Sequence, residues 1–252
     1  MTETQILTLV TGGNRGMGLE LVKQLSQAGQ RVLMGSRNLD NGVAAVKQLG
    51  LTDDQVTVIQ LDVTDPASVT QAAQTIENKF GYLTTLINNA GAVFDGRQAP
   101  SQVNLDDVRA DFELNYFGLI DVTEKMIPLL EKSSQAKIIN ISSMMGSKTA
   151  ALDPTTNVYQ AVAVGYQSAK AAANMYTVQL AKEFQRRQQP ITVNATDPGM
   201  IATAFGSGDP EKSKAMGALP IEDGVVRTME LATDFTNQAT ATFTNSDGAV
   251  GW

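Results

Sequence analysis

Short apolar segments and longer amphipathic segments alternate along the chain from residue 6 to residue 196. The apolar segments are rich in Val and Ile and hydrophobic at consecutive positions; they lie at 6–10, 31–36, 56–61, 84–89, 137–142 and 191–196. Continuous hydrophobicity predicts strands covered on both faces, as in a parallel sheet. The segments between them follow a helical period, at 17–28, 40–49, 66–80, 105–130 and 166–186. This order predicts a single-domain, doubly wound α/β fold of the Rossmann type with a mostly parallel central sheet.

The chain carries no sign of a second domain. It has no internal repeat, no linker rich in Pro, Gly or Ser, and no run of like charges, so we expect one domain over residues 1–252. An apolar segment at 239–245 is consistent with an additional edge strand. The least regular segments are 92–104, 144–160 and 200–216. Each would follow the carboxyl end of a strand, where open α/β sheets bind ligands, so we expect these loops to select the substrate.

The charge balance and the missing residue types exclude several kinds of function. The formal net charge is −7, and an acidic surface of this kind repels nucleic acid and anionic membranes. The chain has no Cys and no His, which excludes disulfides and thiol chemistry and removes the commonest metal ligand. We therefore expect no bound zinc, although an all-carboxylate Mg²⁺ or Ca²⁺ site stays open. The N-terminal residues lack the features of a signal peptide, and no apolar run approaches the roughly 20 residues that span a bilayer, so we expect a cytoplasmic protein.

The first predicted strand leads directly into a glycine-rich loop, TGGNRGMG at 11–18, and then into a helix. Glycines at 12, 16 and 18 permit a tight turn, a close backbone approach and close packing of helix against strand. The start of such a helix presents unpaired N–H groups, which suit an anionic pyrophosphate. Glycine clusters are also common in plain turns, and it is the strand–loop–helix context that favours a dinucleotide site here.

The residues after the second and third strands concern the adenosine half of a dinucleotide. NAD-specific Rossmann proteins usually carry an acid after the second strand, but this chain has Arg37 there, and Arg15 lies in the glycine loop. Two guanidinium groups suit the 2′-phosphate of NADP, whereas the alternative is two solvated surface arginines. Asp62 ends the third strand and could accept from the adenine amino group. Its neighbour Asp65, just before Pro66, is expected to cap a helix.

Taken in order, these motifs resemble the single-domain short-chain dehydrogenases/reductases over nearly the whole chain. TGGNRGMG is similar to the family's TGxxxGxG loop, and the other matching motifs are NNAG (88–91), Asn115 in LNYFG, Ser143 in NISS, Tyr166 with Lys170 as YxxxK, and DPG (197–199) followed by Thr203. The NYFG stretch, Asn14-Arg15, Arg37 and the ending FTNSDGAVGW are most similar to the NADPH carbonyl reductase branch, which includes menthone-type reductases. The resemblance implies an NADPH-dependent enzyme that reduces ketones or aldehydes to alcohols.

The resemblance also implies roles for individual residues. The catalytic set that it implies is Asn115, Ser143, Tyr166 and Lys170. The NADP-binding set that it implies is Gly12, Asn14, Arg15, Gly16, Met17, Gly18, Arg37, Asp62, Val63, Asn89, Ala90, Gly91, Tyr166, Lys170, Pro198, Gly199 and Thr203. Asn115 would hold a water that relays protons to Lys170, the alternative being a surface Asn in a helix kink. Ser143 would hydrogen-bond the substrate oxygen, and Ser142 is the alternative. Successive strand residues face opposite ways, so only one of the two serines can point toward the cofactor.

The Tyr166–Lys170 pair explains how proton transfer could proceed without histidine. Positions i and i+4 share one face of a helix, so the Lys170 ammonium would lie close to the Tyr166 phenol. A free tyrosine has a pKa near 10, which the ammonium and the positive ring of the oxidised cofactor would lower. Tyr166 would then protonate the carbonyl oxygen while hydride reaches the carbonyl carbon, or do the reverse. Tyr159 is the rival tyrosine, but the residue four positions on is Ala163, so no cation supports it.

The chain departs from the family pattern between the serine and the tyrosine. Ser143 lies 23 residues before Tyr166, further than in typical members, and the extra residues fall in 148–164. Insertions here in the carbonyl reductase branch cover the active site and can block the helix face used for tetramers, so a dimer, a tetramer and a monomer all stay open. The polar, Gly-rich segment 204–217 is expected to form a mobile lid, with a plain disordered loop as the alternative.

Two other functions stay open on the sequence. A reductase of 3-oxoacyl thioesters on an acidic carrier protein would need a basic patch near the site, and the lid offers only Lys212 and Lys214 beside Asp209 and Glu211. A non-catalytic sensor of NADP redox state would share the fold, but such proteins usually lack the tyrosine–lysine pair. We therefore expect a small-molecule carbonyl compound as substrate.

Overall fold

The computed structural model describes residues 5–96, 98–206 and 208–252. Residues 1–4, Arg97 and Ser207 lie outside the described part. The expectations for the N-terminal residues, and for one position in each of the loops 92–104 and 200–216, therefore fall outside the described residues. No helix in the described part of the chain has the length and apolar character needed to cross a bilayer.

The described strands form one eight-stranded sheet in the order β3-β2-β1-β4-β5-β6-β7-β8. Their bounds are β1 Leu7–Val10, β2 Arg31–Ser36, β3 Val56–Gln60, β4 Thr85–Asn88, β5 Ala136–Ile141, β6 Ile191–Thr196, β7 Phe243–Asn245 and β8 Gly248–Ala249. The strands pair in parallel except for β7 with β8, which are antiparallel. Because β4 follows β3 in the chain but lies beside β1 in space, the winding direction reverses between β1 and β4. This switch point places the ligand crevice at the carboxyl ends of those strands.

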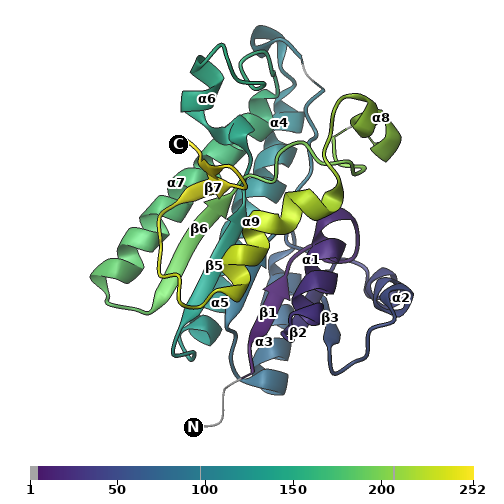
Figure 1. Cartoon of the computed structure of the whole chain (residues 1–252), viewed down its shortest axis with the longest axis vertical. Helices are drawn as coiled ribbons and strands as arrows, with labels where there is room; N and C mark the ends of the chain where they lie inside the picture. The colour runs from purple at the N-terminus through teal and green to yellow at the C-terminus, as the bar shows by residue number, and fades with distance from the viewer. Residues whose placement is uncertain (1–4, 97, 207) are drawn as a thin grey trace.

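Helices cover both faces of the sheet (Figure 1). Their bounds are α1 Gly16–Gln27, α2 Leu39–Leu49, α3 Pro66–Phe80, α4 Leu105–Phe112, α5 Gly118–Leu130, α6 Lys148–Leu152, α7 Val164–Arg186, α8 Pro210–Ala215 and α9 Ile221–Thr233. Three short turns complete the described elements: the 3₁₀ turns Pro100–Gln102 and Met144–Gly146 and the π-helical turn Glu113–Phe117. The single-domain doubly wound α/β fold predicted from the sequence is confirmed.

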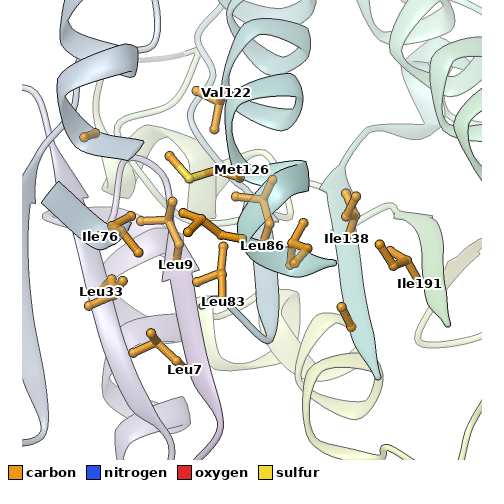
Figure 2. Close-up of a cluster of buried hydrophobic side chains, with 14 of the residues drawn as sticks. Leu7, Leu9, Leu33, Ile76, Leu83, Leu86, Val122, Met126, Ile138 and Ile191 are labelled. Atoms are coloured by element: carbon orange, nitrogen blue, oxygen red, sulfur yellow. The ribbon is translucent and has the colours of Figure 1, made fainter. Parts of the chain in front are cut away.

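Two hydrophobic clusters flank the sheet, one on each face. Leu7 and Leu9 point to the face covered by α3, α5 and α7, whereas Val10 belongs to the cluster under α1, α2 and α9. Figure 2 shows the first cluster, in which Ile76 from α3 and Met126 from α5 meet side chains from the strands. All residues of β1, β4, β5 and β6 are buried. The continuous hydrophobic runs therefore mark strands that are covered on both sides, as predicted.

The structure corrects the predicted elements at several places. The helix α9 was not predicted at all, and the expected loops 92–104, 144–160 and 200–216 contain the 3₁₀ turn Pro100–Gln102, α6 and α8. The predicted helix 105–130 is continuous in outline but is divided by the π-helical turn Glu113–Phe117 into α4 and α5. The expected edge strand at 239–245 is limited to β7, which lies between β6 and β8 and so is not itself at the edge; Ala241, two residues before it, takes a left-handed conformation with φ of 58°.

Candidate active site

The glycine loop leaves the carboxyl end of β1 and is held in place by the end of β4. Thr11 Oγ1 accepts hydrogen bonds from the backbone N–H groups of Asn89 and Ala90, both at 2.9 Å. The Asn89 side chain donates to the carbonyl oxygens of Thr11 and Gly12, at 2.8 and 3.2 Å. A Cβ added to Gly18 would lie 2.3 Å from the Gly12 carbonyl oxygen, so only glycine fits there. Asn89 and Ala90, predicted to bind the cofactor, thus brace the loop that precedes α1.

The start of α1 differs from the starts of α2, α3 and α4. Those three helices begin at Asn38, Asp65 and Asn104, whose side chains accept hydrogen bonds from backbone N–H groups of the first turn. The predicted cap at Asp65 is therefore confirmed. α1 begins after Arg15, has no side-chain cap and has no acidic residue in its first turn, which contains Gly16 and Met17. Its first N–H groups are available to an anionic ligand.

Arg15 and Arg37 lie at the same edge of the sheet. The backbone N–H of Gly13 donates to the carbonyl oxygen of Gly35 at 2.9 Å, which joins the glycine loop to the end of β2. Each arginine lies two residues beyond that bond, and both are exposed. Neither forms an ion pair with another described residue. Two free guanidinium groups therefore flank the region after β2, and Asn14 lies in the turn beside Arg15.

Asp62 and Val63 follow β3, one strand further from the switch point. Asp62 Oδ1 accepts from the backbone N–H and the hydroxyl of Thr64, at 3.0 and 2.8 Å, which closes a local turn. The Val63 carbonyl oxygen lies so close to Gly118, at the start of α5, that an added Cβ would be 2.6 Å away. One Asp62 carboxylate oxygen is thus engaged by its own loop.

Tyr166 and Lys170 lie in the first turns of α7 and are both buried, with 5% and 4% of their surface exposed. The Ser143 hydroxyl, just past the end of β5, is hydrogen-bonded to the Tyr166 phenol. Lys170 Nζ lies 5.7 Å from the centre of the Tyr166 ring and donates to the carbonyl oxygen of Ile141 at 2.8 Å. A Cβ added to Gly146 would lie 2.7 Å from the Lys170 carbonyl carbon, so the turn after Ser143 packs directly on α7.

Burial dominates the electrostatics of this pair. It raises the pKa of the Tyr166 phenol well above its ordinary value; the Ser143 hydrogen bond opposes the rise, and the carboxylates of Asp197 and Asp111 add to it. Burial also lowers the pKa of the Lys170 ammonium to about 8. The sequence analysis expected Lys170 and the ring of a bound oxidised cofactor together to lower the phenol pKa; in the protein alone the pKa is raised, because desolvation by burial dominates.

Asn115 lies in the π-helical turn Glu113–Phe117 and is only 1% exposed, so the alternative of a surface Asn is wrong. Its Nδ2 donates to the carbonyl oxygens of Ala92 and Asp111, at 2.8 and 2.9 Å, and its Oδ1 accepts from the Ala92 N–H at 3.3 Å. A Cβ added to Gly91 would lie 2.9 Å from Asn115 Oδ1 and 3.7 Å from Lys170 Nζ. The π turn thus brings Asn115 and Lys170 to the same place beside β4.

The rival residues lie in different surroundings. Ser142 is buried, and its hydroxyl donates to Asn174 Oδ1 inside the protein, away from the Tyr166 phenol that Ser143 contacts. Tyr159 is 46% exposed in the loop before α7. The structure therefore groups Ser143 with Tyr166, while Ser142 and Tyr159 lie apart from them.

The segment after β6 closes over the glycine loop. Asp197 Oδ1 accepts from the N–H groups of Met144 and Gly199, at 2.9 and 3.3 Å, and Gly199 turns the chain with φ of 74° directly after Pro198. A Cβ added to Gly16 would lie 3.7 Å from Thr203 Cγ2, so Thr203 packs against the start of α1. All the predicted site residues therefore lie along one edge of the sheet, at the carboxyl ends of its strands.

Several residues of this region were missed in the sequence. Phe205 packs its ring edge-to-face on Tyr166, with ring centres 5.7 Å apart, although 44% of its surface is exposed. Asp111 and Asp197 are buried and raise the Tyr166 pKa. Asp197 belongs to the DPG motif that the sequence analysis named without giving this residue a role, whereas nothing local distinguishes Asp111 from other helix carboxylates. No group of three or more acidic residues in the described part of the chain is arranged to hold a metal ion.

Comparisons with known proteins agree with this geometry. The chain is 35% identical over 224 residues to the short-chain dehydrogenase anuI of Penicillium roqueforti, covering 86% of this chain and 87% of that protein. It is 29% identical to the (+)-neomenthol dehydrogenase of Arabidopsis thaliana, covering 91% and 92% of the two chains. The crystal structure of NADPH-bound carbonyl reductase from chicken fatty liver superposes with a TM-score of 0.82 at 26% identity, covering 99% of this chain and 100% of that one. The short chain dehydrogenase family model matches residues 7–214, and the chain belongs to this family.

Proposed function

We propose that the protein is an NADPH-dependent reductase that converts ketones or aldehydes to alcohols, reversibly. The observation that carries the proposal is the buried contact of Ser143 with Tyr166, with Lys170 one helical turn further along α7. This contact lies at the same sheet edge as the glycine loop, so a carbonyl carbon can meet a nicotinamide there while its oxygen meets the phenol. The carbonyl reductase and neomenthol dehydrogenase relatives support the same class of reaction.

The residues at the β1–β4 crevice fit a dinucleotide. The uncapped start of α1 suits a pyrophosphate, and the absence of side chains at Gly12 and Gly18 lets the loop pack closely against Ala90 and the start of that helix. The exposed Arg15 and Arg37, without ion-pair partners among the described residues, suit a 2′-phosphate and favour NADP over NAD. The structural relative from chicken is named as NADPH bound, which supports the same cofactor.

Each side chain of the site has a distinct role in the proposed reaction. A bound nicotinamide supplies the hydride. Tyr166 donates its proton to the carbonyl oxygen, and the Ser143 hydroxyl holds that oxygen and stabilises the charge that develops on it. Lys170, held by the Ile141 carbonyl, keeps a positive charge near the phenol and orients the ribose. Asn115 fixes the backbone at Ala92 and supports a water beside Lys170.

The test is to follow NADPH absorbance while purified protein is mixed with ketones, aldehydes and ketoacyl thioesters. Tyr166→Phe removes the proton donor but keeps the ring, so turnover should fall by about 1,000-fold or more while NADPH affinity is kept. Tyr159→Phe is the matched control, because that tyrosine is 46% exposed and its side chain forms no hydrogen bond or ring contact with a described site residue, and its turnover should stay within about twofold of the wild type. Turnover retained by Tyr166→Phe would refute the role.

No observation favours the other functions left open by the sequence. Lys214 is paired with Glu211 at 2.7 Å, which weakens the basic patch that an acidic carrier protein would need. A non-catalytic sensor has no use for the buried Tyr166–Lys170 arrangement. The substrate is therefore proposed to be a small carbonyl compound, and the absence of nucleic acid partners, the oligomeric state, the cytoplasmic location and the mobile lid at 204–217 stay predictions.

A further inference from the structure

We propose that Asp95 and Asp111 hold one proton between them, and that this carboxyl pair positions the start of α7, and with it Tyr166, against the loop after β4. The two residues touch neither the expected cofactor nor the substrate. They are positioning residues, and their effect on turnover rests on the proposed reductase function.

The hydrogen bonds around the pair leave one carboxylate oxygen without a donor. Asp111 Oδ1 and Oδ2 accept from the backbone N–H groups of Phe94 and Asp95, at 3.1 and 3.2 Å. Asp95 Oδ2 accepts from the Gly165 N–H at 2.9 Å. Asp95 Oδ1 is buried, and no amide or hydroxyl group among the described residues donates to it. The side chains of Asp95 and Asp111 lie within hydrogen-bond reach of each other, so a proton on Asp111 would supply a donor for Asp95 Oδ1.

The surroundings of Asp111 favour that proton. Asp111 is fully buried and Asp95 is 7% exposed. Burial raises the pKa of Asp111 to about 6, the backbone N–H groups of Phe94 and Asp95 oppose the rise, and the nearby Asp95 charge adds to it. Two adjacent buried carboxylates cannot both ionise without strong repulsion. The pair therefore keeps its proton below about pH 6 and loses it above.

Three segments of the chain meet at the pair. A Cβ added to Gly165 would lie 2.6 Å from Asp111 Oδ2, so the first turn of α7 rests directly on this carboxyl group. Tyr166 is the next residue, and the Asp111 carbonyl oxygen accepts from Asn115 Nδ2 at 2.9 Å. Phe94 and Asp95 belong to the loop after β4. The pair thus ties that loop, α4 and α7 together beside two residues of the proposed catalytic set.

Loss of the proton should disturb Tyr166 in two ways. The repulsion between two carboxylates would weaken the hold of Asp95 on the Gly165 N–H, and a second negative charge near the phenol would raise the pKa of Tyr166 further. The titratable groups that interact with Asp111 are Asp95 from the loop and Tyr166 from α7, and Lys170 and Asp197 in turn lie near Tyr166. Reduction should therefore slow as the pH rises through about 6.

The kinetic test compares Asp111→Asn with the wild type. An amide at position 111 cannot ionise. Its nitrogen can donate to Asp95 Oδ1 at every pH, although one of the two backbone N–H groups that Asp111 accepts then loses its acceptor. With saturating NADPH, wild-type kcat should fall roughly tenfold as the pH rises through the Asp111 pKa, whereas the kcat of Asp111→Asn should stay nearly level. Asp106→Asn, on the same helix but exposed and paired with Arg109, is the matched control and should keep the wild-type profile. An unchanged inflection in Asp111→Asn would overturn the proposal.

A second measurement needs no turnover and so separates this proposal from the proposed reaction. The folded-state pKa of Asp111 is raised, so its contribution to stability is complete below the unfolded value of 3.8 and is lost as the pH rises through about 6. The Asn side chain does not titrate, so the stability of Asp111→Asn lacks this pH-dependent loss. The unfolding midpoint of Asp111→Asn should therefore rise relative to that of the wild type as the pH increases from 3.8 to about 6. This holds even if no carbonyl compound is reduced. A difference in midpoint that does not change with pH would overturn the shared proton.

Discussion

The two sides of the crevice are formed by different kinds of residues and interactions. The glycine-loop side is held by backbone groups and uncharged side chains, such as Thr11 and Asn89, and its helix start has no cap. The tyrosine side buries ionisable groups: Tyr166 and Lys170 lie in α7, and the carboxyl groups of Asp111, Asp95 and Asp197 lie around them. The glycine-loop side thus depends on close packing of the backbone, whereas the tyrosine side depends on the protonation states of buried groups.

This difference indicates how each side should respond to change. Close backbone packing has no tolerance for an added methyl group but is insensitive to pH. Buried ionisable groups tolerate isosteric replacement of a neutral form but respond strongly to the gain or loss of one proton. Substitutions on the glycine-loop side should therefore change nucleotide affinity, and those on the tyrosine side should change turnover and its pH dependence.

The largest effect on the glycine-loop side is expected from Gly18→Ala. Its Cβ would lie 2.3 Å from the Gly12 carbonyl oxygen and 2.5 Å from Asn89 Nδ2, so the loop has to move away from α1. NADPH affinity, measured by fluorescence titration, should fall by about 100-fold, which corresponds to an overpacking cost of about 3 kcal/mol. Gly96→Ala is the control, because no described atom outside its chain neighbours lies within 4 Å of the added methyl group. An NADPH affinity equal to that of the wild type in Gly18→Ala would show that the glycine loop can accommodate the added methyl group, which contradicts this prediction.

A smaller effect, and on the opposite property, is expected from Gly165→Ala. The added methyl group would lie 2.6 Å from Asp111 Oδ2 and 2.9 Å from Val108 Cα, which forces α7 and α4 apart next to Tyr166. We expect a loss of about 1–3 kcal/mol in the free energy of unfolding and about a 30-fold loss of kcat. NADPH affinity should stay within about threefold, since the glycine loop is not touched. A larger loss of affinity than of kcat would contradict the separation of the two sides.

The sequence predicted the glycine-loop side better than the tyrosine side, for a physical reason. A strand, a glycine turn and a helix start are adjacent along the chain, so local pattern suffices to find them. The contacts of Asp111 join three segments that are distant in sequence, and no periodicity reports them. The upward shift of the Tyr166 pKa in the protein alone was not predicted for the same reason, since desolvation is set by everything that packs around the ring.

Some of what was missed did have a local signal. α9 carries buried residues at Val225, Thr228, Leu231 and Ala232, a helical spacing that the sequence analysis passed over. The π-helical turn around Asn115 had none, because a continuous amphipathic run looks the same with or without one extra residue per turn. The boundaries of α6 and α8 depend on short segments, where periodicity has too few residues to be decisive.

The smallest expected effect tests whether charge has any place on the glycine-loop side. Arg37 is exposed and forms no ion pair with another described residue, so Arg37→Ala removes a guanidinium group without disturbing packing. NADPH affinity should fall about tenfold, the value of one charge-assisted hydrogen bond, while NADH affinity stays level because NADH has no 2′-phosphate. Arg186→Ala, exposed at the far end of α7, is the control and should change neither. An equal loss of affinity for NADPH and NADH would mean that Arg37 stabilises the loop itself and does not bind the 2′-phosphate.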